Sequence, residues 1–190
     1  TVATILILLA MVVHTVSFAR GCKTPALDFA ISMTGIFYLG WIGSYFIDLR
    51  SLSNGLWWIL LVIPTIAIGD TGAYLIGSRF GRHLLAPLVS PKKTVEGYFG
   101  GLLFAILAGM LFAALWHACA PTITLLRGAI TGAVLGLLTP LGDLGESMFK
   151  RQFQVKDISN ILGSHGGIFD RIDSWLWGAV IGYYLIVWFW

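Results

Sequence analysis

The sequence predicts an all-α integral membrane protein, a polytopic bundle of about six transmembrane helices. Of its 190 residues, 57% are hydrophobic and 11% are charged, whereas about a quarter of the residues in a soluble domain are charged. A helix needs about 20 apolar residues to cross a bilayer core roughly 30 Å thick. Each apolar stretch is expected to be a helix, because lipid offers no water to the backbone. The six stretches lie at about residues 1–18, 27–47, 56–76, 97–116, 125–141 and 175–190.

The chain is expected to form a single transmembrane domain. No repeat or low-complexity linker divides residues 1–190, and the six stretches leave no room for a separate soluble domain. The first stretch lacks the basic segment and the small-residue cleavage site of a signal peptide. Because the sequence begins at Thr1 inside an apolar run, we expect that the true amino terminus is missing.

Positive charge is concentrated on one side of the predicted bundle. Ten of the twelve lysines and arginines follow the first, third or fifth stretch, and only Arg50 and Arg127 fall on the opposite side. By the positive-inside rule, the loops rich in bases face the cytoplasm. The net charge of +3 is small and unevenly placed. This pattern suits a multi-pass protein of the cell membrane, such as a bacterial inner membrane, better than a nucleic-acid binder.

Prolines and glycines predict how these helices bend and pack. Pro64 lies within the third stretch and Pro140 near the end of the fifth, and each is expected to kink its helix. Small residues four positions apart let helices approach closely, either within the chain or in a homodimer. Both uses are compatible with the sequence. The pairs are Gly97 with Gly101, Gly132 with Gly136 and Gly178 with Gly182.

Asp70 interrupts an apolar stretch that otherwise needs no charge. A carboxylate at membrane depth costs about 2.5 to 3.5 kcal/mol on insertion scales, so it usually lines a cavity or meets a cation. Asp70 is therefore a candidate substrate-binding residue. The alternative is a buried ion pair with Arg79 or Arg82.

The stretch "SPKKTVEGYFGG" places two lysines before a predicted helix. Thr94 is suited to cap that helix, and Glu96 falls in its first turn, where an acid complements the helix dipole. Lys92 and Lys93 would then lie beside a helix amino terminus, a place that favours anions. They would contact either anionic lipid headgroups or a polyphosphate, and this stretch does not distinguish the two.

The stretch from Gly142 to Asp173 gathers acids, bases and glycines in one place. If the fifth helix continues, Asp143, Glu146 and Lys150 share one of its faces. Asp170 and Asp173 repeat a spacing of three after the sequence "GSHGG". Carboxylates beside bases and a glycine-rich loop suit a magnesium-bound triphosphate, although a purely structural network of ion pairs is the alternative. The pattern GxxxxGK[ST] does not occur in the sequence, so a Walker-type phosphate loop is excluded.

This stretch resembles the signature of the phosphatidate cytidylyltransferases, also called CDP-diacylglycerol synthases. The Gly142-Asp143 pair, "SPKKTVEG" and "DTGAY" resemble the family as well, in the same order. The resemblance covers about residues 70–173. The signature is met at Ser147, Lys150-Arg151, Lys156-Asp157, Ser159, Leu162-Gly163, His165-Gly166-Gly167, Asp170-Arg171 and Asp173.

Two departures from the family are visible. Members commonly have Pro-Gly before His-Gly-Gly, where this chain has Gly163-Ser164, and this change is expected to leave the loop less rigid. Family members are also longer at the amino end. The chain therefore resembles the carboxyl-terminal catalytic part of a longer enzyme.

The resemblance implies a nucleotidyltransferase that converts CTP and phosphatidate to CDP-diacylglycerol and diphosphate, with Mg²⁺ as cofactor and the number of ions open. It implies Asp143 and Asp170 as metal ligands, with Asp173 and Glu146 as further candidates. His165 is expected to contact a phosphate or a hydroxyl group, because no second histidine lies near it in sequence. The expected catalytic residues are Asp143, Asp170, Lys150, Arg151, Lys156, His165 and Arg171. The expected substrate-binding residues are Asp70, Lys92, Lys93, Ser147, Gly166 and Gly167.

Other functions remain as alternatives. A paralogue could act on another lipid phosphate, and a cation transporter could use intramembrane acids as an ion path. Transport predicts acids near mid-membrane on several helices, whereas most acids here fall at helix ends on the predicted cytoplasmic side. The CDP-alcohol phosphatidyltransferases are disfavoured, since their DGxxAR core is absent from the sequence. The expected partners are CTP, phosphatidate, membrane lipids and, as an alternative, a second copy of the chain.

Overall fold

The computed structural model describes residues 2–155 and 169–190, with only the backbone of residues 170 and 171. The chain divides into two compact units, Thr1–Ser44 and Tyr45–Trp190. Within the described residues, six helical stretches are long and apolar enough to cross a membrane, which confirms the predicted multi-pass α-helical architecture. They are Val2–Ala19, Pro25–Ser51, Gly55–Phe80, Val95–Trp116, Leu125–Gln152 and Ile172–Phe189. That residues 1–190 form one domain stays a prediction.

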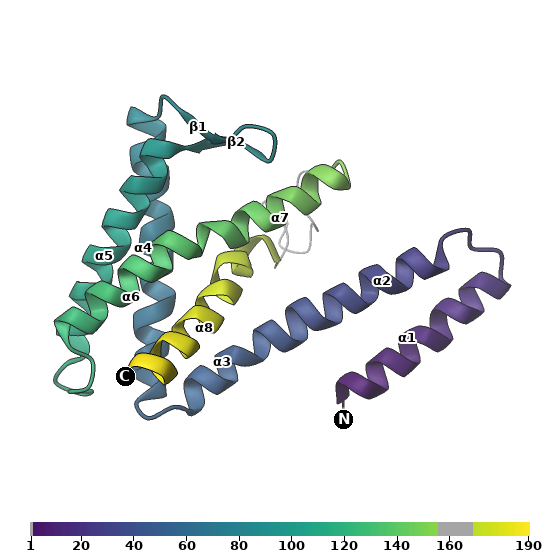
Figure 1. Cartoon of the computed structure of the whole chain (residues 1–190), viewed down its shortest axis with the longest axis horizontal. Helices are drawn as coiled ribbons and strands as arrows, with labels where there is room; N and C mark the ends of the chain where they lie inside the picture. Colours follow the sequence, from purple (N-terminus) through teal and green to yellow (C-terminus); the bar gives the residue numbers. More distant parts are fainter. Residues whose placement is uncertain (1, 156–168) are drawn as a thin grey trace. The chain divides into compact units, whose positions relative to one another are not determined.

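The first unit is a pair of helices (Figure 1). Its elements are α1 (Val2–Ala19), α2 (Pro25–Gly35), a π-helical segment η1 (Ile36–Trp41) and the start of α3 (Ile42–Ser51). His14 of α1 and Ser32 of α2 are hydrogen-bonded, with 3.1 Å between Nε2 and Oγ. The Phe29 ring meets the His14 ring edge-on. Polar contact inside an otherwise apolar pair fixes which faces of the two helices meet.

The second unit is a helical bundle with a small hairpin at one end (Figure 1). In it, α4 packs along α5, α6 packs on α5, and α8 contacts α4 and α7. The two short antiparallel strands were not predicted. The elements are the rest of α3, then α4 (Gly55–Phe80), β1 (Leu84–Ala86), β2 (Ser90–Thr94), α5 (Val95–Trp116), α6 (Leu125–Leu138), α7 (Pro140–Gln152) and α8 (Phe169–Phe189).

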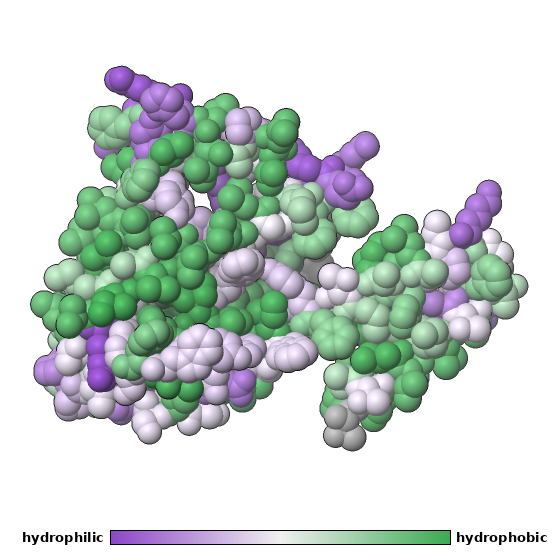
Figure 2. All heavy atoms as spheres, viewed as in Figure 1, coloured by the Kyte–Doolittle hydropathy of each residue, from purple (hydrophilic) through white to green (hydrophobic). Residues whose placement is uncertain are grey.

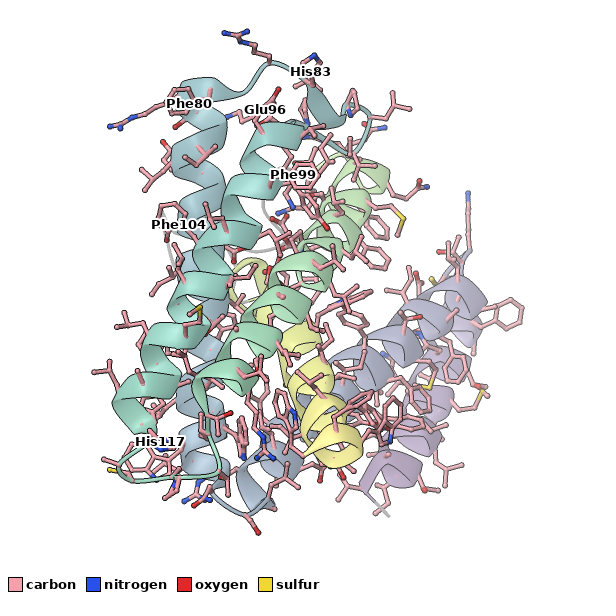
Figure 3. All side chains as sticks on the ribbon, turned by 60° about the vertical axis from the view of Figure 1, so that its left-hand side comes forward. Phe80, His83, Glu96, Phe99, Phe104 and His117 are labelled. Atoms are coloured by element: carbon pink, nitrogen blue, oxygen red, sulfur yellow. The ribbon has the colours of Figure 1, made fainter. Side chains whose placement is uncertain are left out.

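Apolar and polar residues are separated along this unit. A buried cluster that includes Leu49, Trp58 and Leu61 lies toward the α3–α4 and α5–α6 connections. Hydrophilic residues gather around the β1–β2 hairpin, while hydrophobic residues cover the flanks of α5 and α6 (Figure 2). His83 lies at the hairpin end and His117 at the opposite end (Figure 3). The apolar core therefore occupies one half of the unit and leaves the hairpin half for polar groups.

Glycines let the helices approach backbone to backbone. A Cβ at Gly132 of α6 would meet the carbonyl of Ala105 on α5, and a Cβ at Gly109 would meet that of Gly128. All three predicted small-residue pairs lie at contacts inside this unit: Gly97 and Gly101 against α4, Gly132 and Gly136 against α5, and Gly178 and Gly182 against α4. Their use in packing within the chain is thus confirmed, and a homodimer stays a prediction.

The two prolines have different effects. The helix α4 runs through Pro64, which has no N–H to give to the carbonyl of Leu60. The indole of Trp116 donates to that carbonyl instead, with 3.3 Å between Nε1 and O. At Pro140 the helix is interrupted, because α6 ends at Leu138 and α7 begins at Pro140. The break between α6 and α7 lies where the sequence predicted a kink, and the bend itself stays a prediction.

We expect Gly132→Ala to destabilise the protein by roughly 1–3 kcal/mol, because the added methyl group would overpack the α5–α6 contact. Gly145→Ala is the matched control, since a Cβ there has no atom within 4 Å. Thermal unfolding of both variants in detergent measures the difference. Equal melting temperatures would contradict the assigned contact.

Candidate active site

A cavity of about 640 Å³ lies in the hairpin half of the second unit. Its walls come from α4, the hairpin, the start of α5, the α6–α7 interruption and the start of α8. Segments from residue 66 to residue 174 thus contribute to one site. Seven residues that the sequence singled out line it together: Asp70, Lys92, Lys93, Asp143, Glu146, Lys150 and Asp173.

Three carboxylates converge in this cavity. Asp143 and Glu146 lie on α7 and Asp173 on α8, and one oxygen of each lies within 4.8 Å of the others. Glu146 and Asp173 are buried, with 3% and 7% of their surface exposed. The backbone N–H of Ser174 donates to Asp173 Oδ1 at 2.6 Å. Converging, buried carboxylates repel one another when ionised, so nearby positive charge stabilises this arrangement.

Two lysines supply that charge. The Lys93 ammonium lies 2.7 Å from Asp143 Oδ2, and the Lys150 ammonium lies 2.9 Å from Glu146 Oε2. The predicted shared face of Asp143, Glu146 and Lys150 on a continuing helix is therefore confirmed. Lys92 also lines the cavity but is exposed. The ammonium groups of Lys93 and Lys150 thus contact the same carboxylates that a bound metal ion would contact.

Thr94 of β2 and Glu96 of α5 join the hairpin to the start of α5. The Thr94 hydroxyl accepts from the N–H of Gly97 at 3.1 Å, which confirms the predicted cap. Glu96 accepts from the backbone N–H of Arg82 at 3.1 Å and of His83 at 3.2 Å. Its other oxygen lies 2.6 Å from His83 Nδ1, and both side chains are labelled in Figure 3. The Glu96 bonds hold the residues before β1 at the start of α5, and β1 pairs with β2, the strand that carries Lys93.

The interruption before α7 is held from the same side. The Tyr98 hydroxyl donates to the carbonyl of Leu137 at 2.9 Å. The Lys93 ammonium lies 3.5 Å from the carbonyl of Pro140. Sequence reasoning missed Tyr98, because nothing local to it indicates a partner on another helix.

Asp70 lies on the cavity wall formed by α4. The alternative of an ion pair with Arg79 or Arg82 is wrong: among the described residues, neither arginine lies within ion-pair distance of it. Asp70 instead lies close enough to Asp143 and Asp173 for their charges to interact. It therefore adds a fourth carboxylate to the same electrostatic environment.

The other predicted site residues either do not line the cavity or have side chains outside the described part of the chain. Arg151 is exposed, and its Nε donates to the carbonyl of Val89 in the hairpin at 3.2 Å. The Ser147 hydroxyl donates to Asp143 Oδ1 at 3.4 Å. Asp170 and Arg171 fall in the first turn of α8, where only the backbone is described. Lys156, His165, Gly166 and Gly167 lie outside the described residues, and the roles predicted for all of these stay predictions.

Comparison with known proteins places this chain in a family. The profile of the cytidylyltransferase family matches residues 1–189. The chain belongs to this family. A phosphatidate cytidylyltransferase of Bacillus subtilis (strain 168) is 40% identical over 153 residues, which are 80% of this chain and 56% of that protein. An enzyme of the same name from Staphylococcus epidermidis (strain RP62A) is 41% identical over 150 residues, 79% of this chain and 56% of the relative.

A third relative has a similar identity and coverage. The phosphatidate cytidylyltransferase of Staphylococcus aureus (strain COL) is 40% identical over 152 residues, again 79% of this chain and 56% of the relative. The chain thus spans about half the length of the relatives it matches.

Proposed function

We propose that this chain is the catalytic part of a membrane-bound nucleotidyltransferase of phospholipid biosynthesis. It would convert CTP and phosphatidate to CDP-diacylglycerol and diphosphate. The observation that carries the proposal is the meeting of three carboxylates and two paired lysines in one cavity of an apolar bundle. The names of the relatives support the choice of substrates.

The charges of the cavity indicate what else the reaction needs. Four carboxylates and three lysines are found among its described lining residues, so with all of them ionised a triphosphate and a lipid phosphate would enter a slightly negative site. Additional cations are required to hold such anions together. We propose Mg²⁺, because hard carboxylate oxygens are its preferred protein ligands.

Asp143, Glu146 and Asp173 would hold this magnesium, since their oxygens converge within 4.8 Å. Asp170 stays a further candidate from the sequence. When bound, the ion would neutralise phosphate charge and favour departure of the diphosphate.

The reaction itself is a displacement at phosphorus. A phosphate oxygen of phosphatidate would attack the α-phosphorus of CTP, a new P–O bond would form, and the bond to the β-phosphate oxygen would break, releasing diphosphate. Lys93 and Lys150 would turn from their carboxylates to the phosphates, and Lys92 would meet the nucleotide from the exposed rim. Positioning and charge neutralisation supply the catalysis in such transfers, so no covalent nucleophile is required.

The deeper wall suits the lipid substrate. Ile66, Gly101 and Ala105 line the cavity together with the charged groups, so one space offers both apolar and polar walls. A cation transporter would need acids spaced through the membrane. The three converging carboxylates instead share one end of the unit with the hairpin lysines, which favours chemistry on a headgroup. A paralogue acting on another lipid phosphate would use the same groups.

The direct test incubates the intact protein with labelled CTP, phosphatidate and magnesium, and looks for a lipid-soluble cytidine product. We expect Asp143→Asn to lower kcat/KM by about a hundredfold or more, because one charged ligand is lost from the reacting centre. Asp48→Asn is the control, since Asp48 is an exposed acid on α3. Absence of product from the intact protein, or full activity of Asp143→Asn, would refute the proposal.

Lys93 is expected to compete with a metal ion for Asp143. Replacing it by methionine should raise the affinity for Mn²⁺ on the order of fivefold, since a partly buried ion pair contributes about 1 kcal/mol, while turnover falls. Lys92→Met is the matched control, because Lys92 is exposed and lies beside Lys93. Electron paramagnetic resonance of free Mn²⁺ measures both affinities. An unchanged or weaker affinity in Lys93→Met would show that the lysine and the metal do not share a site.

We further propose that the cavity opens toward the cytoplasm. Lys92, Lys93 and Arg151 meet at the hairpin end, whereas Arg127 lies over Trp190, 5.6 Å from the ring centre, at the other end. The positive-inside rule assigns the first end to the cytoplasm.

Cysteine labelling tests this orientation. Leu88 is 93% exposed between the strands, and Cys119 is exposed after α5. In intact cells that carry Cys22→Ser, an impermeant maleimide should react with Cys119 and spare a cysteine introduced by Leu88→Cys. The reverse pattern would place the cavity on the outer side.

A further inference from the structure

We infer that Tyr98 is a positioning residue, which fixes the first turn of α7 and thereby the carboxylates of Asp143 and Glu146. The inference rests on the proposed function, and it concerns a residue that neither the sequence motifs nor the charges of the cavity single out. Tyr98 lies in the first turns of α5 and lines the cavity.

The interruption before α7 creates the need for such a residue. Pro140 has no N–H, and α6 ends at Leu138, so α7 is not held in line by an unbroken ladder of backbone bonds. Asp143 lies only one turn beyond this joint. The Tyr98 hydroxyl donates to the carbonyl of Leu137 at 2.9 Å, so it bonds the chain directly at the joint.

The element that carries Tyr98 is itself firmly placed. Gly97 and Gly101 flank Tyr98 on α5, and a Cβ at either position would crowd α4. Thr94 caps the same helix end. A hydroxyl on this rigid segment can therefore transmit the position of α5 to α7.

Two charged contacts also tie α7 to this side of the unit, but each has another task. Lys93 reaches Asp143 and the carbonyl of Pro140, and in the proposed reaction its ammonium leaves for a phosphate. Arg151 bonds the hairpin near the far end of α7. The Tyr98 bond is neutral and involves a backbone carbonyl, so it persists when phosphates enter. It is the contact best suited to hold Asp143 and Glu146 toward Asp173 during turnover.

The test compares Tyr98→Phe with Tyr45→Phe in the intact protein. The control also loses one tyrosine hydroxyl contact, since Tyr45 and Tyr184 lie 2.7 Å apart through their hydroxyl groups, but it lies outside the cavity lining. Two readouts are taken: hydrogen–deuterium exchange of residues 140–147 in lipid nanodiscs, and kcat together with the magnesium concentration for half-maximal activity.

In Tyr98→Phe we expect faster exchange of residues 140–147, a kcat lowered roughly three- to tenfold, which corresponds to one net hydrogen bond, and a raised magnesium requirement. Tyr45→Phe should leave all three unchanged. Unchanged exchange in Tyr98→Phe would overturn the inference whatever the activity. Faster exchange with unchanged kcat and magnesium requirement would reduce Tyr98 to a structural contact. An inactive wild-type protein would refute the proposed function, and the positioning role with it, while the exchange data would still report whether Tyr98 holds the joint.

Discussion

The repulsion among Asp143, Glu146 and Asp173 is the constraint that the rest of the second unit satisfies. Three carboxylate oxygens within 4.8 Å of one another, two of them from buried side chains, repel one another unless a proton is shared or positive charge lies beside them. Lys150 comes from the same helix as two of the acids, whereas Lys93 comes from the hairpin. The hairpin, the cap of α5 and the interruption before α7 together position Lys93 beside Asp143.

Close helix packing makes that meeting geometrically feasible. Backbone contacts at Gly109 and Gly132 bring α5 against α6, so a strand that precedes α5 can reach the beginning of α7. The apolar cluster at the other end of the unit stabilises the bundle without filling the cavity. The apolar cluster and the cavity thus occupy different ends of the same unit.

The sequence predicted those features that depend on local pattern. The lengths of the apolar stretches predicted the six membrane-spanning helices. The three- and four-residue spacings predicted that Asp143, Glu146 and Lys150 share one helix face. Local pattern could not predict contacts between segments that are distant in the sequence. Glu96 accepts a hydrogen bond from His83, 13 residues away. Tyr98 donates to the carbonyl of Leu137, 39 residues away, and Arg151 donates to the carbonyl of Val89, 62 residues away. The short strands escaped prediction because "SPKKT" carries a proline and two lysines, a composition poor in strand formers.

The order of the ion pairs along the chain has a consequence for biogenesis. Lys93 is synthesised before its partner Asp143, and Lys150 follows Glu146 by a single helical turn. Each acid of α7 therefore has its counter-charge either earlier in the chain or on the same helix. The two ion pairs of α7 need no residue that follows Lys150 in the chain, whereas Asp173 arrives later with α8.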